Sequence, residues 1–193
     1  LFIGTLGART RDPLLFPLIV ANTAFGGTFT GRLMNEVRSQ RGWSYGAYSR
    51  LLHSDQRDAW YMWTAPSIEY AADCAALQIE LMERWLESGI RGTEARFAKK
   101  YLVNSHCFDL DTPVKRLEAS MDIELLGLPP SYVHGYVGRV KAVTTQQANA
   151  AIASRLSARD LTIVAVASAA EVADSFERLP GLDSLQIVPF RSL

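Results

Sequence analysis

Apolar positions along the chain alternate between the spacing of helices and the spacing of strands, which is typical of an α+β domain. Residues 1–8 read as a strand, and residues 44–54 and 58–65 read as the two strands of a hairpin. The continuous apolar run 161–167 (LTIVAVA) is expected to be a central strand buried on both faces. We therefore predict a mixed sheet with most helices on one face, closed by a last strand at 185–188.

Helix starts and stops are marked by capping residues, proline and glycine. Helices are expected from Asp12-Pro13 to about residue 24, and from Pro66-Ser67 to about residue 87. A helix capped by Thr30 carries Leu33, Met34 and Val37 at helical spacing, and Gly42 stops it. Further helices are expected at residues 93–108, 112–126 and 170–179, with starts at Thr93, Thr112-Pro113, Ser131 and Thr144.

Two elements allow a prediction of which residues share a face. Alternation in the aromatic strand AWYMWT places Trp60, Met62 and Thr64 on one face, and Tyr61, Trp63 and Ala65 on the other. We favour core packing for this strand over an aromatic peptide-binding patch. The helix that follows carries an apolar stripe, expected to comprise Ala72, Ala76, Ile79 and Met82.

Candidate chemistry gathers where the helix stopped by Gly42 gives way to the strand at Ser44. Arg38 lies on the closing turn of this helix and Tyr45 opens the strand, so a tight reversal brings their polar ends together. A guanidinium fork and a phenol hydroxyl can together hold a peptide carbonyl. The alternative is an arginine that interacts with the helix dipole and a half-buried strand tyrosine, and spacing alone favours that alternative.

A longer motif surrounds this pair: an Asn-x-x-x-Gly-Gly turn from Asn22, then Gly31-Arg32-Leu33, then Val-Arg-x-x-x-Gly-x-x-Tyr from Val37. It resembles the C-terminal half of the pitrilysin and insulinase-like metallopeptidases, which include the mitochondrial processing peptidases. The order of elements resembles that family along nearly the whole chain. The sequence departs from the family at Ser39, where an acidic residue is usual, and at Gly42-Trp43, where Gly-Leu is common.

The resemblance implies an α+β half-domain with a mostly antiparallel sheet and helices mainly on one face. It implies the zinc-free, substrate-binding half of a zinc metalloendopeptidase, not catalytic alone, with Arg38 and Tyr45 on peptide carbonyls opposite a zinc-bearing half or homologous subunit. Zinc would belong to that half, upstream or in a separate chain, and the assembly would be a dimer or oligomer. The alternative is a non-proteolytic structural or assembly subunit of the same fold, and an unrelated enzyme or binding module is the third interpretation.

Histidine and cysteine positions give no metal motif. His53, His106 and His134 are far apart, and none stands in a His-x-x-Glu-His pattern. Cys74 and Cys107 are isolated on apolar helical runs, and each is expected to be a small buried residue. We therefore expect neither a metal ligand nor a cofactor on this chain.

Length and charge limit the remaining possibilities. The 193 residues are 48% hydrophobic, which allows one sizeable core, and we expect a single domain over 1–193. Twenty basic and twenty acidic residues cancel, which argues against a nucleic-acid partner bound through net charge. No apolar run reaches the length of a membrane span. Leu1 opens directly in a strand, so we expect a fragment or processed product, with a bacterial periplasm or cytoplasm as its compartment.

Overall fold

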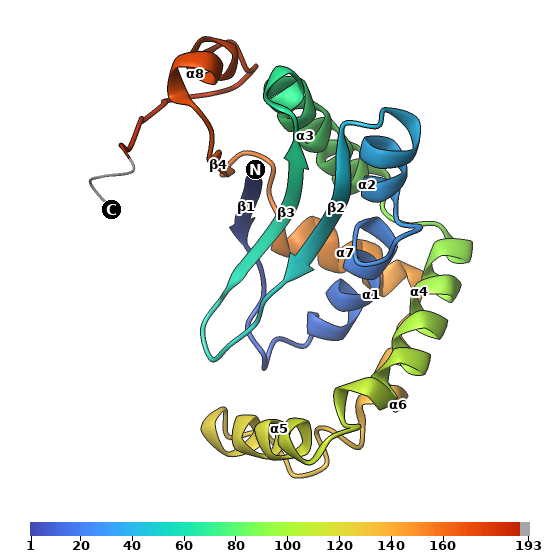
Figure 1. The fold of residues 1–193 in the computed structure, drawn as a ribbon. Coiled ribbons are helices and arrows are strands. Elements are labelled where there is room, and N and C mark those ends of the chain that lie inside the picture. Colours follow the sequence, from blue (N-terminus) through green and yellow to red (C-terminus); the bar gives the residue numbers. More distant parts are fainter. Residues whose placement is uncertain (190–193) are drawn as a thin grey trace.

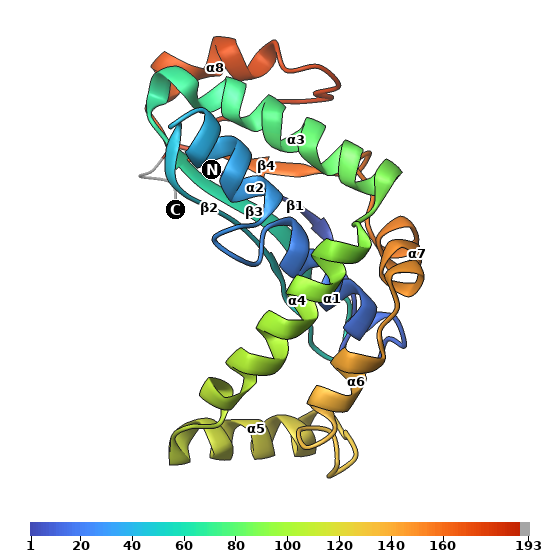
Figure 2. The ribbon, with the colours of Figure 1, turned by 90° about the vertical axis from the view of Figure 1, so that its right-hand side faces the viewer.

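The computed structural model describes residues 1–189, and within them an antiparallel sheet in the order β2-β3-β1-β4 carries the helices mainly on one face (Figures 1 and 2). The strands are β1 (Phe2–Leu6), β2 (Ser44–Leu51), β3 (Ala59–Pro66) and β4 (Thr162–Val164). Both neighbours of β1 are antiparallel to it, and β2 with β3 forms the predicted hairpin. The predicted fold class is confirmed.

Helices α1 (Leu15–Phe25) and α3 (Ala71–Ser88) contact the sheet, and α7 (Thr145–Arg155) packs on both of them. Helix α2 (Arg32–Met34) continues into a π-helical turn, Asn35–Gln40, that leads to β2. Helices α4 (Gly92–Ser105), α5 (Pro113–Leu125) and α6 (Tyr136–Ala142) extend away from the sheet, while α8 (Ala169–Glu177) lies near the start of α3 (Figure 2). No helix among the described residues is long and apolar enough to cross a membrane.

The core is centred on three aromatic rings from different elements. Phe25 of α1 stacks on Trp85 of α3 with the ring centroids 4.4 Å apart, and the centroid of Trp60 of β3 lies 5.6 Å from that of Trp85. All three side chains are fully buried. The predicted alternation is confirmed: Trp60, Met62 and Thr64 share the face of β3 that packs on the core, and Tyr61, Trp63 and Ala65 share the outer face of the sheet. These rings join the helical layer to the sheet.

Several predicted signals are confirmed. The Thr112 hydroxyl accepts a hydrogen bond from Lys115 N, and Thr144 with Gln147 forms a capping box before α7. Gly42 has a φ of 66° and ends the π-helical turn, in a left-handed conformation that glycine adopts without strain.

Other local predictions are wrong in their exact positions. Gly31, and not Thr30, precedes α2. Helix α4 begins directly after Arg91 and not at Thr93, and the Arg91 amide donates a hydrogen bond to Glu94. Helix α6 begins at Tyr136, five residues after Ser131. The core side of α3 is rotated from the predicted stripe, because Met82 is buried but Ala72, Ala76 and Ile79 are only partly covered. The buried set on α3 is Ala71, Cys74, Ala75, Leu77, Gln78, Leu81, Met82 and Trp85.

Cys74 is buried as predicted, but Cys107 is exposed because it lies on the short turn that follows α4.

The predicted central strand at 161–167 is wrong in position and in extent. Only Thr162–Val164 pair with the sheet, and they do so at its edge, beside β1. Val164 and Val166 are exposed, since no described element covers the outer face of β4. The expected strand at 185–188 does not form, and Leu185, Ile187 and Val188 are exposed outside the sheet. An apolar run signals strand propensity, but its place in a sheet depends on the partners it meets.

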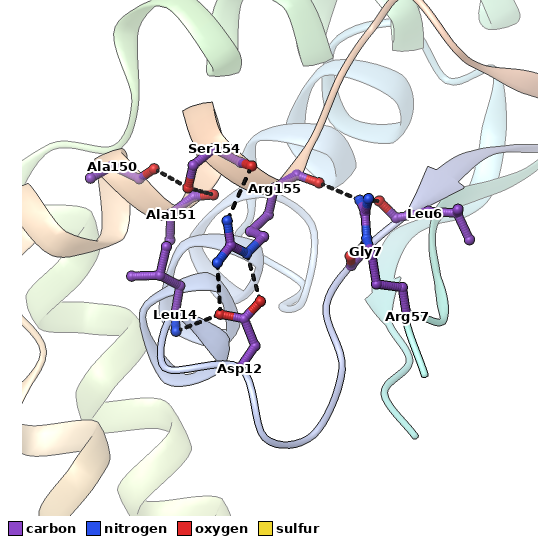
Figure 3. A network of polar contacts seen from close by, with 9 residues as sticks. All are labelled: Leu6, Gly7, Asp12, Leu14, Arg57, Ala150, Ala151, Ser154 and Arg155. Atoms are coloured by element: carbon purple, nitrogen blue, oxygen red, sulfur yellow. Dashed lines mark hydrogen bonds and ion pairs between the residues drawn. The ribbon is translucent and has the colours of Figure 1, made fainter. Parts of the chain in front are cut away.

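A polar network fastens the start of α1 to the end of α7 (Figure 3). Arg155 donates from Nε to Asp12 Oδ2 at 2.6 Å and from Nη2 to Asp12 Oδ1 at 3.1 Å, and the amide of Leu14 donates to the same carboxylate. Arg57 donates to the carbonyls of Leu6, Gly7 and Arg155. The network therefore ties the end of β1 and both helices together.

Asp12 should make the stability of this network depend on pH. Burial alone would raise the pKa of Asp12, but the hydrogen bonds from Arg155 and Leu14 outweigh it and hold the pKa below the ordinary 3.8. Because the folded-state pKa is depressed, the stabilisation is present above pH 3.8 and is lost as the pH falls through the folded-state pKa. Asp12→Asn should lower the free energy of unfolding by about 1–2 kcal/mol at pH 7, since it breaks a partly buried, bidentate charged pair.

Urea denaturation of wild type and Asp12→Asn at pH 7, 5 and 3 measures this effect. The difference between the two proteins should shrink towards pH 3. A difference that stays constant over this range would contradict the assignment.

Candidate functional site at the Arg38 turn

Arg38 and Tyr45 lie on either side of a tight reversal. Arg38 belongs to the π-helical turn Asn35–Gln40, a rare geometry that recurs at functional sites, and its carbonyl accepts a 2.9 Å hydrogen bond from the amide of Gly42. After Gly42 the chain enters β2, with Tyr45 at its second position. The reversal brings the two side chains together.

The Arg38 guanidinium rests against two aromatic rings. Its central carbon lies 4.3 Å from the ring centroid of Tyr45 and 4.8 Å from that of Phe29. Both distances fall within the range of cation–π attraction. Phe29 was not expected from the sequence, and its only signal was a large apolar residue in a polar loop directly after the Gly26-Gly27 turn.

The polar ends of this cluster are open to solvent. The Tyr45 side chain is 85% exposed and Phe29 is 66% exposed, while Arg38 is half-buried. Within residues 1–189, no carboxylate pairs with Arg38 and no hydrogen bond engages its guanidinium. The rings therefore hold a charged fork whose N–H donors remain available.

A β-bulge determines where Tyr45 points. Ser44 pairs with Pro66 and Ala47 pairs with Thr64, so β2 carries one extra residue at Tyr45-Gly46. The Ser44 hydroxyl donates to the Gly46 carbonyl at 2.6 Å and accepts from the amide of Ala65 at 2.9 Å. This hydroxyl bridges the gap in the ladder, and the extra residue leaves Tyr45 exposed between buried Ser44 and Ala47.

The buried Asn22 side chain fixes the turn that leads to Phe29. Asn22 Oδ1 accepts hydrogen bonds from the Ser49 hydroxyl at 2.7 Å and from Trp60 Nε1 at 2.8 Å, and its amide donates to the Ser49 carbonyl. The Ser49 amide also donates to the Gly26 carbonyl. A Cβ on Gly26 would lie 2.5 Å from the Ser49 hydroxyl oxygen, so glycine is required at this contact. The turn is therefore docked on the middle of β2.

Arg32, the first residue of α2, anchors the segment that leads into the π-helical turn. Its guanidinium forms a bidentate pair with Glu94 at the start of α4, with N···O distances of 2.7 and 2.6 Å. Burial opposes ionisation of Glu94, but this pair and the Arg91 amide hold the pKa of the carboxyl below its ordinary value. The short helix α2 is thereby anchored to α4.

The helix-end alternative for Arg38 does not describe these contacts. Arg41, and not Arg38, donates to a carbonyl of the π-helical turn, that of Glu36 at 3.0 Å. Tyr45 is exposed and not half-buried. The geometry instead gives a cation framed by two rings.

Histidines lie outside this cluster. His53 contacts the Thr10 hydroxyl, and burial lowers the pKa of its imidazole. His106 lies 3.1 Å from Asp109 and stacks on Tyr136. Among the described residues, no group of three or more His, Cys, Asp or Glu side chains could hold a metal ion.

Comparison with known proteins finds a family match over the N-terminal part of the chain. Residues 1–90 match the family model of the peptidase M16 inactive domain. This match confirms the resemblance to the pitrilysin-type metallopeptidases, and the matched segment includes Phe29, Arg38 and Tyr45. A solved M16 inactive domain from Pseudomonas fluorescens shares the fold, with a TM-score of 0.74 and 24% identity over 83% of this chain and 38% of that one.

Two curated relatives differ in their descriptions. The non-peptidase homologue YmxG from Helicobacter pylori is 25% identical over 143 residues, which are 74% of this chain and 33% of YmxG. An uncharacterized zinc protease from Mycobacterium tuberculosis is 28% identical over 142 residues, 74% of this chain and 32% of that protein. The chain therefore spans about a third of the curated relatives it matches.

Replacing Asn22 should destabilise this domain more than a typical polar substitution. Asn22→Ala leaves the Ser49 hydroxyl and Trp60 Nε1 buried without their acceptor, which should cost about 2–4 kcal/mol of unfolding free energy. Gln146→Ala, an exposed position on α7, is the control and should change it by no more than about 0.5 kcal/mol. Chemical denaturation followed by tryptophan fluorescence measures both, and equal losses in the two variants would refute the role assigned to Asn22.

Proposed function

We propose that this chain is the zinc-free, substrate-binding half of a pitrilysin-type zinc metalloendopeptidase, with Arg38 and Tyr45 holding the peptide substrate. The observation that carries the proposal is the unpaired Arg38 guanidinium framed by the exposed rings of Tyr45 and Phe29. A structural arginine would be expected to have a carboxylate or carbonyl partner, and the described residues offer Arg38 neither. A ligand with carbonyl oxygens would satisfy these donors.

The two rings favour binding by holding the guanidinium in place before substrate arrives. A free arginine side chain loses rotamer freedom on binding, and contact with Tyr45 and Phe29 reduces that loss. The Arg38 fork would donate to one peptide carbonyl and the Tyr45 hydroxyl to a neighbouring one. Such donors act most strongly when negative charge develops on a carbonyl oxygen during hydrolysis.

Zinc would be supplied by a partner half in this proposal. The described residues include no cluster of three metal-ligating side chains, so no step is assigned to zinc on this chain. The mycobacterial relative named as a zinc protease is about three times as long as the matched region, which leaves room for a second half. That half would lie upstream in the same polypeptide or in a separate subunit, of a bacterial periplasmic or cytoplasmic protein.

A non-proteolytic structural or assembly role is the second candidate, and the name of the Helicobacter pylori relative favours it. In that role nothing would need to bind Arg38, and its replacement would not alter peptide cleavage by any assembled partner. Cleavage measurements with a zinc-bearing half therefore separate the two candidates.

Arg38→Ala and Tyr45→Phe should each reduce turnover in the assembled peptidase on the order of 100-fold, the usual cost of a lost oxyanion donor. Neither should unfold the domain, because one removes a half-buried side chain and the other a solvated hydroxyl. Arg38→Lys keeps the charge but loses the planar fork, so it should recover only part of the activity.

Arg41→Ala is the matched control, since it removes a neighbouring guanidinium that contacts Glu36 and Trp43 and lies outside the pair. Turnover of a peptide substrate and melting temperature are measured for all four variants with the zinc-bearing half present. Wild-type turnover in the Arg38→Ala variant would rule out the substrate-binding role proposed for Arg38.

A further inference from the structure

A surface far from the Arg38 turn carries two uncovered apolar stripes. Helix α4 and the turn after it expose Phe97, Tyr101 and Phe108, with 44–64% of each side chain accessible. Helix α5 exposes Val114, Leu117, Met121 and Leu125, with 51–76% accessible. Phe97 and Tyr101 are four residues apart on one face of α4, and Phe108 lines the same hollow from the turn that follows. The four residues of α5 recur at spacings of three and four residues, so they form one face of that helix. We call α4, α5 and the turn between them the helical arm.

The arm is held so that the α5 stripe points away from the domain. No residue of α5 is buried, and its half-covered positions Ala119 and Ile123 lie on the face opposite the stripe. Arg11 anchors the end of the helix by donating to the carbonyls of Leu126 and Gly127. Figures 1 and 2 both show α5 at the end of the molecule farthest from α8. The stripe is therefore an outward face of a fixed helix.

The charges that flank the two stripes and have no partner among the described residues are opposite in sign. Arg96 and Lys100 lie beside Phe97 and Tyr101 on α4, while Glu118 and Glu124 lie on either side of the α5 stripe. All four are exposed, and in the part of the chain that the structure describes none of their side chains forms a hydrogen bond or an ion pair. The α4 stripe is therefore flanked by unpaired positive charges and the α5 stripe by unpaired negative charges.

The two helices that carry the stripes also have similar lengths. A shallow hollow of about 400 Å³ runs along the α4 stripe, lined by Phe97, Lys100, Tyr101, Asn104, Ser105 and Phe108. Helices α4 and α5 have 14 and 13 residues, so they extend about 21 and 20 Å at 1.5 Å per residue. The aliphatic side chains of α5 are suited to pack against the aromatic side chains that line this hollow.

We propose that the helical arm is the contact between two copies of this chain, with α4 of each copy laid against α5 of the other. A two-fold axis makes both contacts at once, because such an interface uses the same patch on each partner. The pairing buries both stripes and sets Arg96 and Lys100 against Glu118 and Glu124 of the second copy. It leaves the Arg38 turn outside the contact, so it is independent of the proposed peptidase role.

Charge reversal in blocks tests this pairing directly. Arg96→Glu with Lys100→Glu, or Glu118→Lys with Glu124→Lys, should each weaken the dimer about tenfold or more, since like charges then face each other. A chain that carries all four substitutions restores opposite charges and should regain a Kd within about threefold of wild type. Sedimentation equilibrium of the 193-residue chain measures the Kd, and circular dichroism confirms that helix content is unchanged.

An apolar variant with a matched control completes the test. Met121→Glu places a charge in the middle of the α5 stripe and should weaken the dimer at least tenfold, whereas Ser120→Glu, on another face of the same helix, should leave the Kd within about twofold. A monomer at about 100 μM, well above a micromolar Kd, would overturn the proposal. A dimer whose Kd is unchanged by either pair of charge reversals would also overturn it. So would charge-reversal variants that keep the wild-type Kd of the dimer and lose only the binding of a different protein.

Discussion

The Asn22 side chain joins α1, β2 and β3 through hydrogen bonds to Ser49 and Trp60 in the buried core. It accepts the indole N–H of Trp60, which itself packs against Trp85, so the same amide connects the aromatic core to the sheet. It also docks the Gly26-Gly27 turn on Ser49, from which the chain continues to Phe29 and α2. The position of the candidate site is thus set by a polar group inside the core.

Two departures from regular backbone shape the site itself. A π-helical turn carries Arg38, and a β-bulge carries Tyr45, with the Ser44 hydroxyl satisfying the backbone groups that the bulge disrupts. Irregularities of both kinds are retained where they position a side chain, since regular geometry forms more backbone hydrogen bonds. Their occurrence seven residues apart, on two residues in mutual contact, is the structural basis for the functional interest of this turn.

Local signals in the sequence predicted the helices and strands better than they predicted the contacts between distant segments. The β2-β3 hairpin, the caps at Thr112 and Thr144 and the division of β3 into two faces depend on neighbours close in sequence, and all were predicted. The edge position of β4 and the contact of Phe29 with Arg38 depend on segments far apart or on a loop without periodicity. For Arg38 and Tyr45, spacing predicted proximity, but only the structure shows the second ring and the missing carboxylate.

The candidate site and the helical arm are connected by one ion pair. Glu94, in the first turn of α4, binds Arg32 through both carboxylate oxygens, and Arg32 opens the short helix that runs into the Arg38 turn. A bidentate pair resists rotation better than a single hydrogen bond, so α2 follows the orientation of α4. The first turn of α4 and the helix that leads to Arg38 therefore keep one relative orientation. The Arg38 turn and the helical arm are separate surfaces, but the Arg32–Glu94 pair fixes the helices at the base of both.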